Sequence, residues 1–127
     1  MSTDTSPTVD QVLASMTRSL NGRVPPSIRH AVTVLPDLVV RHAQDSAFAM
    51  PPEGGSLTNE TRTLIYLGIA LATGSRACIE AMTDKAQALG IEPEKLLETF
   101  KIARFAEATR VLGNAEPLLA RLDEPRA

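Results

Sequence analysis

The segment from residue 57 to residue 90 constrains the fold of this chain more than any other part of it. Its sequence is LTNETRTLIYLGIALATGSRACIEAMTDKAQALG. A cap at Thr58 or Asn59 is followed by apolar residues on nearly every side of a helix, until Gly74 ends it. Ser75 caps a second helix, which another glycine ends. The segment therefore predicts a central, buried helix joined by a tight turn to a second helix.

Helical periodicity covers most of the remaining chain as well. Apolar residues recur at helical spacing, and Gly or Pro separates one run from the next. No run alternates between apolar and polar residues as a half-buried strand would. We therefore predict an all-α fold of six to seven helices. The other expected helices cover 8–20, 25–35, 37–50, 93–113 and 116–122. In the helix that Pro93 begins, the apolar residues expected to face the core are Leu96, Leu97, Phe100, Ala103 and Ala106.

The expected domain boundaries follow from two segments without periodicity. Residues 1–7 are polar, and we expect them to form a disordered arm. The sequence PPEGGSL at residues 51–57 contains two prolines and two glycines, which is typical of a linker. We predict a single domain over 8–123, in which this linker separates N-terminal helices over 8–50 from a Cys-bearing helical core over 58–123.

Composition and charge argue against several functional classes. The 127 residues are 43% hydrophobic, which suffices for one core, and the net charge of −2 provides no attraction to nucleic acid or to acidic membranes. The longest apolar run covers only 64–73, well short of the ~20 residues that a membrane helix needs. The N-terminus is polar, and one cysteine cannot form an internal disulfide. We therefore expect a cytoplasmic protein.

Cys78 is the residue most suited to chemistry, and its position has two interpretations. Ser75 provides the N-cap, so Cys78 falls in the first helical turn, where unpaired N–H groups and the helix dipole favour a thiolate. Arg76 adds to that effect, whereas Glu80 opposes it. A lone cysteine between apolar helices is more often a small buried side chain without reactivity. Both interpretations remain open.

The segment LTNETRTLIYLGIALATGSRACIEAMTDKAQALGIEPEKLLETFKIARF resembles the carboxymuconolactone decarboxylase and AhpD-like alkylhydroperoxidase family. The resemblance covers roughly residues 57–112 and rests on the phrases TRTLIYLGIALATG and CIEAMTDKAQALG, which follow the family's order and spacing. It implies an AhpD-like helical fold. It also implies a homo-oligomer of the trimer or hexamer type, because small members of this family pair their central helices across subunits.

The family's catalytic positions carry over to four residues of this sequence. The peroxidase branch has a Cys-x-x-Cys turn, a His four residues later and a Glu about twelve residues before the first Cys. The first Cys then falls on Ser75, the second on Cys78, the His on Met82 and the Glu on Thr63. Neither Thr63 nor Met82 transfers protons near neutral pH, so the proton relay is lost. The lactone decarboxylase branch also keeps a His where Met82 stands. The sequence leaves open that Ser75 replaces a natural cysteine.

These departures lead to three functional hypotheses. The first is a degenerate member without peroxidase activity, which binds a small apolar ligand or a protein partner. The second is a single-cysteine oxidoreductase that reduces peroxide through Cys78 with an external thiol reductant. The third is a lyase of the lactone decarboxylase type that uses His30 or His42 as the base. Neither histidine has the spacing of a metal-ligand motif, and we expect no metal and no cofactor.

Overall fold

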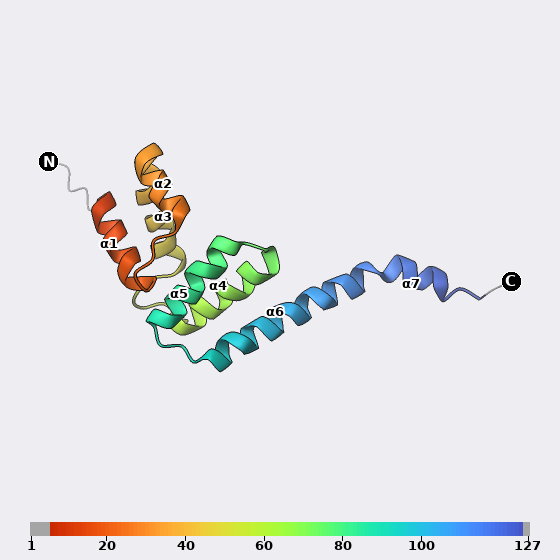
Figure 1. Ribbon diagram of the computed structural model, residues 1–127. Coiled ribbons are helices and arrows are strands. Elements are labelled where there is room, and N and C mark those ends of the chain that lie inside the picture. Colours follow the sequence, from red (N-terminus) through yellow and green to blue (C-terminus); the bar gives the residue numbers. More distant parts are fainter. Residues whose placement is uncertain (1–5, 126–127) are drawn as a thin grey trace.

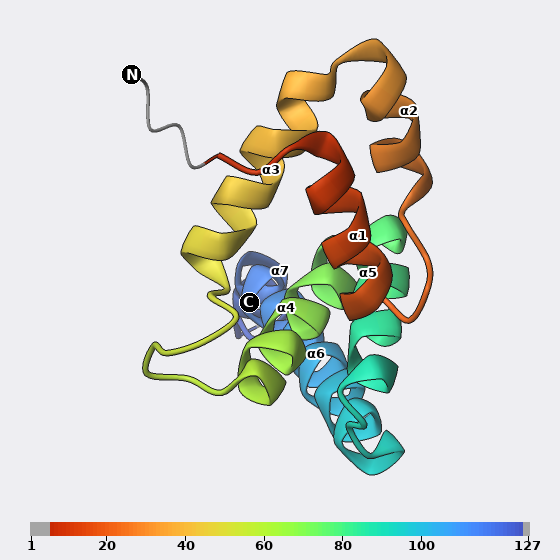
Figure 2. The ribbon, with the colours of Figure 1, turned by 90° about the vertical axis from the view of Figure 1, so that its left-hand side faces the viewer.

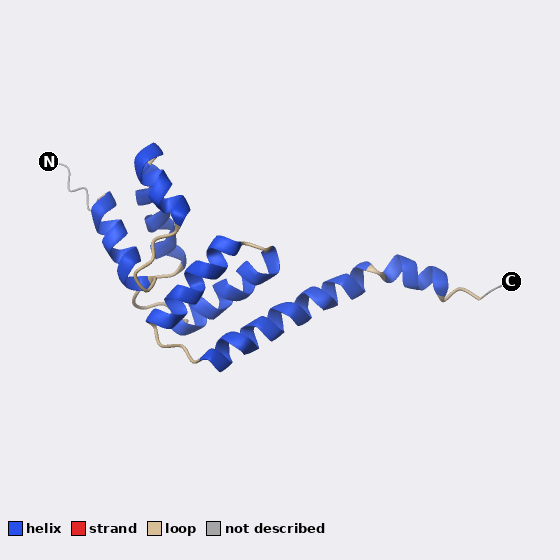
Figure 3. Ribbon diagram, viewed as in Figure 1, coloured by secondary structure: helices blue, strands red, loops and turns tan. Residues whose placement is uncertain are grey.

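The structure, a computed structural model, describes residues 6–125 and is helical throughout its regular elements (Figure 3). Within that range there are seven helices and no strand, which confirms the predicted all-α class. Residues 1–5 of the predicted N-terminal arm lie outside the described range. The helices are α1 (Val9–Ser19), α2 (Pro26–Val34), α3 (Pro36–Ala49), α4 (Asn59–Thr73), α5 (Arg76–Ala88), α6 (Pro93–Asn114) and α7 (Glu116–Leu122).

Local signals fix most of the helix ends. Thr8 and Gln11 form a capping box at the start of α1, in which each side chain accepts a hydrogen bond from the backbone N–H of the other residue. The Thr58 hydroxyl accepts from the backbone N–H of Thr61 and caps α4. Gly74 ends α4 in the left-handed conformation, with φ of 75°, which a residue with a Cβ adopts only at a cost. The turn between α4 and α5 therefore depends on this glycine.

The helices form two groups and an extended arm (Figures 1 and 2). Helices α1, α2 and α3 lie together at one end, where α3 contacts both α1 and α2. The α4–α5 hairpin lies beside them, and α1 contacts α5. Helix α6 packs against α4 and then runs away from the other helices, with α7 at its far end (Figure 1). No helix among residues 6–125 is long and apolar enough to cross a membrane.

Arg62 holds the linker before α4 in place, a role that the sequence did not reveal. Its side chain is 92% buried, since the residue keeps only 8% of its exposure. Its guanidinium donates hydrogen bonds to the backbone carbonyls of Pro51, Gly54 and Leu57, and also to the side-chain oxygen of Asn59. A glycine- and proline-rich segment that has no regular structure is thereby tied to the first turn of α4.

The prediction that the helix over 58–73 is buried on nearly every side is wrong for the single chain. Its buried residues are Arg62, Thr63, Leu67 and Ala70, whereas Ile65 and Ile69 keep 48% and 59% of their exposure. Helices α5 and α6 cover only part of its circumference. The uncovered part, together with α6, forms an apolar groove of about 520 Å³.

The predicted core stripe of α6 is also largely uncovered. Ala103 is its only buried member, Leu96 is half-buried, and Ala106 is exposed. Leu97 and Phe100 keep 59% and 50% of their exposure. The physical reason is the direction of α6, which leaves the rest of the molecule after the turns that pack on α4 (Figure 1). The apolar residues of α6 are spread around the helix, and the single chain covers few of them.

Candidate functional site

Cys78 lies in the first turn of α5, as predicted, and is half-buried. Ser75 occupies the N-cap position, but its side chain makes no capping hydrogen bond, so the expected hydroxyl cap is absent. The Arg76 side chain points to solvent and pairs with Glu80 at 3.3 Å. Its charge is thus engaged away from the thiol. Of the features expected to activate Cys78, the position at the start of a helix is the one that the structure retains.

The thiol contacts a residue that the sequence did not connect with it. The Tyr66 hydroxyl on α4 lies 3.3 Å from Cys78 Sγ, within hydrogen-bonding distance for sulfur. This hydrogen bond, partial burial and the charge of a Cys78 thiolate raise the pKa of Tyr66 above its ordinary value of 10.0. Tyr66 therefore stays protonated at neutral pH and can donate a hydrogen bond to the sulfur. In the sequence, only the spacing of twelve residues across a glycine turn indicated that Tyr66 and Cys78 could meet.

Thr63 and Met82 lie on the same sides of the hairpin as this contact. Thr63 is three residues before Tyr66 and Met82 is four residues after Cys78, so each lies one helical turn away on the same face. Thr63 is fully buried, and its hydroxyl donates to the backbone carbonyl of Asn59 at 2.7 Å. Met82 keeps 8% of its exposure. The two positions to which the resemblance assigns the family's acid and base thus hold buried side chains that do not titrate.

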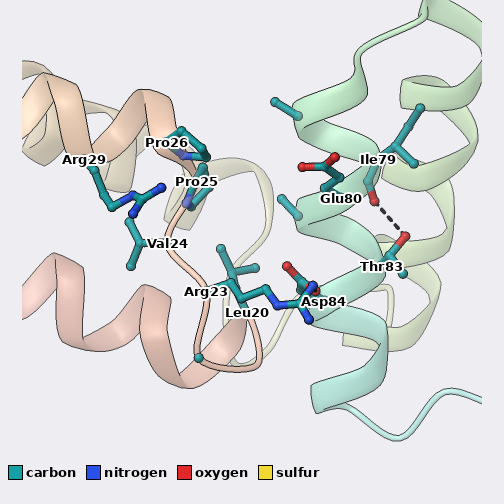
Figure 4. A pocket seen from close by; sticks show the side chains of 13 residues that line it. Leu20, Arg23, Val24, Pro25, Pro26, Arg29, Ile79, Glu80, Thr83 and Asp84 are labelled. Atoms are coloured by element: carbon teal, nitrogen blue, oxygen red, sulfur yellow. Dashed lines mark hydrogen bonds and ion pairs between the residues drawn. The ribbon is translucent and has the colours of Figure 1, made fainter.

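A second feature, an open cleft of about 750 Å³, lies on another face of α5 (Figure 4). The α5 wall includes Ala77, Glu80, Ala81 and Asp84, whose spacing places them on one side of the helix. Cys78 and Met82 are not among the lining residues. The opposite wall comes from the α1–α2 connection and the start of α2, through Leu20, Gly22, Arg23, Val24, Pro25, Pro26 and Arg29.

The charged groups of the cleft are unequally paired. Arg23 Nη1 lies 3.3 Å from Asp84 Oδ1, and the Asp84 side chain is only 10% exposed. This ion pair ties the α1–α2 connection to α5 across one end of the cleft (Figure 4). Arg29 lines the α2 wall and has no hydrogen bond or ion pair within the described residues. The sequence contained no signal for this cleft, because its two walls are far apart in the chain, at residues 20–29 and 77–84.

His30 and His42 are both exposed, on α2 and α3 respectively. Neither lines the cleft or the groove between α4 and α6. Residues 6–125 contain no group of three or more His, Cys, Asp or Glu side chains placed to hold a metal ion. The histidines are therefore not assembled with any other group that would give them a catalytic setting.

Comparison with known proteins places the chain in a family. The sequence model of the carboxymuconolactone decarboxylase family matches residues 35–120, which extends from the start of α3 into α7 and includes the α4–α5 hairpin. A comparison with curated proteins gave no match. Because the family match spans well over half of the sequence, this chain belongs to the carboxymuconolactone decarboxylase family.

Proposed function

We propose that this protein is a non-peroxidatic member of its family that acts by binding a small molecule. The observation that carries the proposal is the state of the α4–α5 hairpin. Its single thiol contacts the Tyr66 hydroxyl, and the positions of the family's acid and base hold Thr63 and Met82, both buried. A dithiol cycle needs a second thiol to resolve the oxidised one, and Ser75 cannot take that part.

The cleft beside α5 is the better place for a ligand than the hairpin interior. Thr63 and Met82 are buried, and neither they nor Cys78 line the cleft or the α4–α6 groove. The cleft has the volume of a small-molecule site, since such sites span roughly 300–1,000 Å³. Leu20, Val24, Pro25, Ile79 and Ala81 give it apolar walls. A small, largely apolar ligand therefore fits this site.

Three measurements test this function. Peroxide consumption with a dithiol donor should be no faster than without protein, and Cys78 should react with an alkylating agent below neutral pH no faster than free cysteine. Binding should depend on the cleft: Ala81→Trp should abolish the binding of apolar probes, because the indole fills the cleft. Ala14→Trp, at an exposed position on α1 that does not line the cleft, is the matched control. Fast labelling below neutrality, or equal binding by both Trp variants, would contradict the proposal.

The Tyr66–Cys78 contact favours one alternative, a single-cysteine oxidoreductase. In that reaction the thiolate attacks one peroxide oxygen, an S–O bond forms as the O–O bond breaks, and the departing oxygen takes a proton to leave as alcohol or water. An external thiol then attacks the sulfenic acid, which releases water, and a second external thiol frees Cys78 as a disulfide leaves. Tyr66 would stabilise the thiolate. A lyase that uses His30 or His42 gains no support, because both lie outside the cleft and the groove.

We also propose that the protein is a homo-oligomer whose contacts involve the α6–α7 arm. The arm has exposed apolar side chains along its whole length: Leu97, Phe100, Ile102, Phe105, Val111, Leu112, Leu118, Leu119 and Leu122. Monomeric proteins rarely expose a continuous apolar surface of this extent. Helix α6 has 22 residues and is therefore about 33 Å long, which keeps α7 away from the chain's own α4–α6 groove.

A second copy of the chain can cover the exposed apolar side chains of each arm. The groove between α4 and α6 is apolar, with Ile65, Ile69 and Ile102 among its lining residues. Every copy thus carries both an uncovered arm and an uncovered groove, which is the condition for a self-complementary contact. A cytoplasmic location is consistent with the free cysteine, and we propose no nucleic-acid or membrane partner.

A further inference from the structure

We infer that the cleft beside α5 binds small apolar molecules that carry one carboxylate, and that Arg29 is the group that binds it. This inference rests on the proposed binding function and adds the chemical class of the ligand. It follows from the pairing of charges around the cleft, from the position of Arg29, and from the apolar character of the surface between the charges.

The charges around the cleft leave one cation without an internal partner. Asp84 is paired with Arg23 at 3.3 Å, and Glu80 is paired with Arg76 at 3.3 Å. Arg29 has no ion pair or hydrogen bond within residues 6–125. Both carboxylates that line the cleft are thus paired with other arginines, and an anionic group of a ligand would give Arg29 a partner. A cationic ligand, in contrast, would have to displace an arginine from its carboxylate.

The position of Arg29 suits recognition of one end of a ligand. Figure 4 shows its side chain on the α2 wall near Val24, across the opening from Glu80 and Ile79 of α5. A guanidinium presents two parallel N–H donors, which match a planar carboxylate in bidentate geometry. Pro25 and Ile79 provide apolar surface within the same cleft. A ligand whose carboxylate binds the Arg29 guanidinium and whose apolar ring or chain lies along Pro25 and Ile79 fits both the charge and the apolar surface.

The test compares three probes that share an apolar ring system and differ in charge: naphthoate, naphthalene methanol and naphthylmethylammonium. Calorimetry should show that naphthoate binds most tightly and the ammonium most weakly. Arg29→Gln should weaken naphthoate binding about tenfold, the equivalent of one charge-assisted hydrogen bond of roughly 1.4 kcal/mol, and should leave naphthalene methanol unchanged. Arg29→Lys should retain part of the affinity, because it keeps the charge and loses the bidentate geometry.

The matched control is Arg41→Gln, which removes an exposed arginine on α3 that does not line the cleft. It should leave naphthoate binding unchanged, whereas a tenfold loss would show that overall charge, and not Arg29, attracts the anion. Thermal unfolding of the Arg29 variants should match the parent, since this exposed side chain has no hydrogen bond or ion pair to lose within residues 6–125.

The same experiment separates failure of this inference from failure of the proposed function. If Ala81→Trp abolishes binding of all three probes while Arg29→Gln changes none, the cleft is a binding site and the carboxylate assignment is wrong. If Ala81→Trp changes no affinity, the probes bind elsewhere, for example in the α4–α6 groove, and both the site and the assignment are overturned.

Discussion

Replacing Phe105 on the α6 arm tests whether a second copy of the chain covers this surface. Phe105 keeps 72% of its exposure, so most of this side chain is uncovered in the single chain. If an oligomer buries this side chain, Phe105→Ala should shift the assembly towards monomers without lowering the stability of the single chain. Most of the side chain contacts solvent in the single chain, so its removal should cost that chain little stability.

The expected size of the effect follows from the exposed fraction. Full burial of a phenylalanine side chain is worth roughly 1.5–3 kcal/mol, so burying the 72% that is still exposed contributes about 1–2 kcal/mol per side chain. A self-complementary contact uses the residue from both copies, which gives about 2–4 kcal/mol per contact and a roughly 30- to 1,000-fold weaker dissociation constant in the variant.

Sedimentation velocity over a dilution series measures this shift. Phe48→Ala is the matched control, because Phe48 is 91% exposed and lies at the end of α3, outside the arm. It should leave the dissociation constant unchanged. Monomeric parent protein at concentrations of tens of micromolar would refute the oligomer, and equal dissociation by both variants would refute the assignment of the arm as the interface.

Three further predictions concern the interior of the hairpin and the linker. Arg62→Met should lower the free energy of unfolding in urea by about 3 kcal/mol, because it leaves several carbonyls of the linker without donors. A loss below about 1 kcal/mol would contradict the role of Arg62 in holding the linker. Burial and the nearby Arg62 lower the pKa of Lys85 below 10.5, so the folded state disfavours the charged form of this side chain. This penalty disappears as the pH increases from the folded pKa towards 10.5. The melting temperature of the parent should therefore rise over that range, relative to that of Lys85→Met. An unchanged difference over that range would contradict this sign. Tyr66 is the only tyrosine, so tyrosinate absorbance should titrate above 10.0 in the parent and closer to 10.0 in Cys78→Ala, where the hydrogen bond is lost; identical titrations would show that the contact is not made in solution.

Local signals made the helices predictable. The capping residue Thr58 and the left-handed Gly74 lie where the sequence indicated, and Pro93 begins α6 as expected. These ends depend on residues within a few positions of one another, so they are encoded where they occur. The family resemblance likewise identified the α4–α5 hairpin, and the family match confirms that part of the prediction.

Burial was much less predictable than helicity. The apolar pattern of α4 and α6 predicts buried surfaces, but a pattern does not state which other surface would cover them. Ile69 and Phe100 were expected in the core and are exposed in the single chain, because α6 diverges from the body. Contacts between distant segments could not be predicted from the sequence either. The Arg23–Asp84 pair joins residues 61 positions apart, and neither residue belongs to a recognisable motif.

The two faces of helix α5 have different surroundings, and this difference supports the proposed function. One face carries Cys78, which contacts Tyr66 of α4, and the buried Met82 one helical turn further along. The other face, through Ala81 and Asp84, borders a cleft whose shape depends on an ion pair to the α1–α2 connection. Substitutions that fill the first face do not enter the second, because helical geometry directs the two sets of side chains apart. Loss of thiol chemistry and a binding site are therefore compatible on the same helix, and we propose that the specificity of that site comes from Arg29.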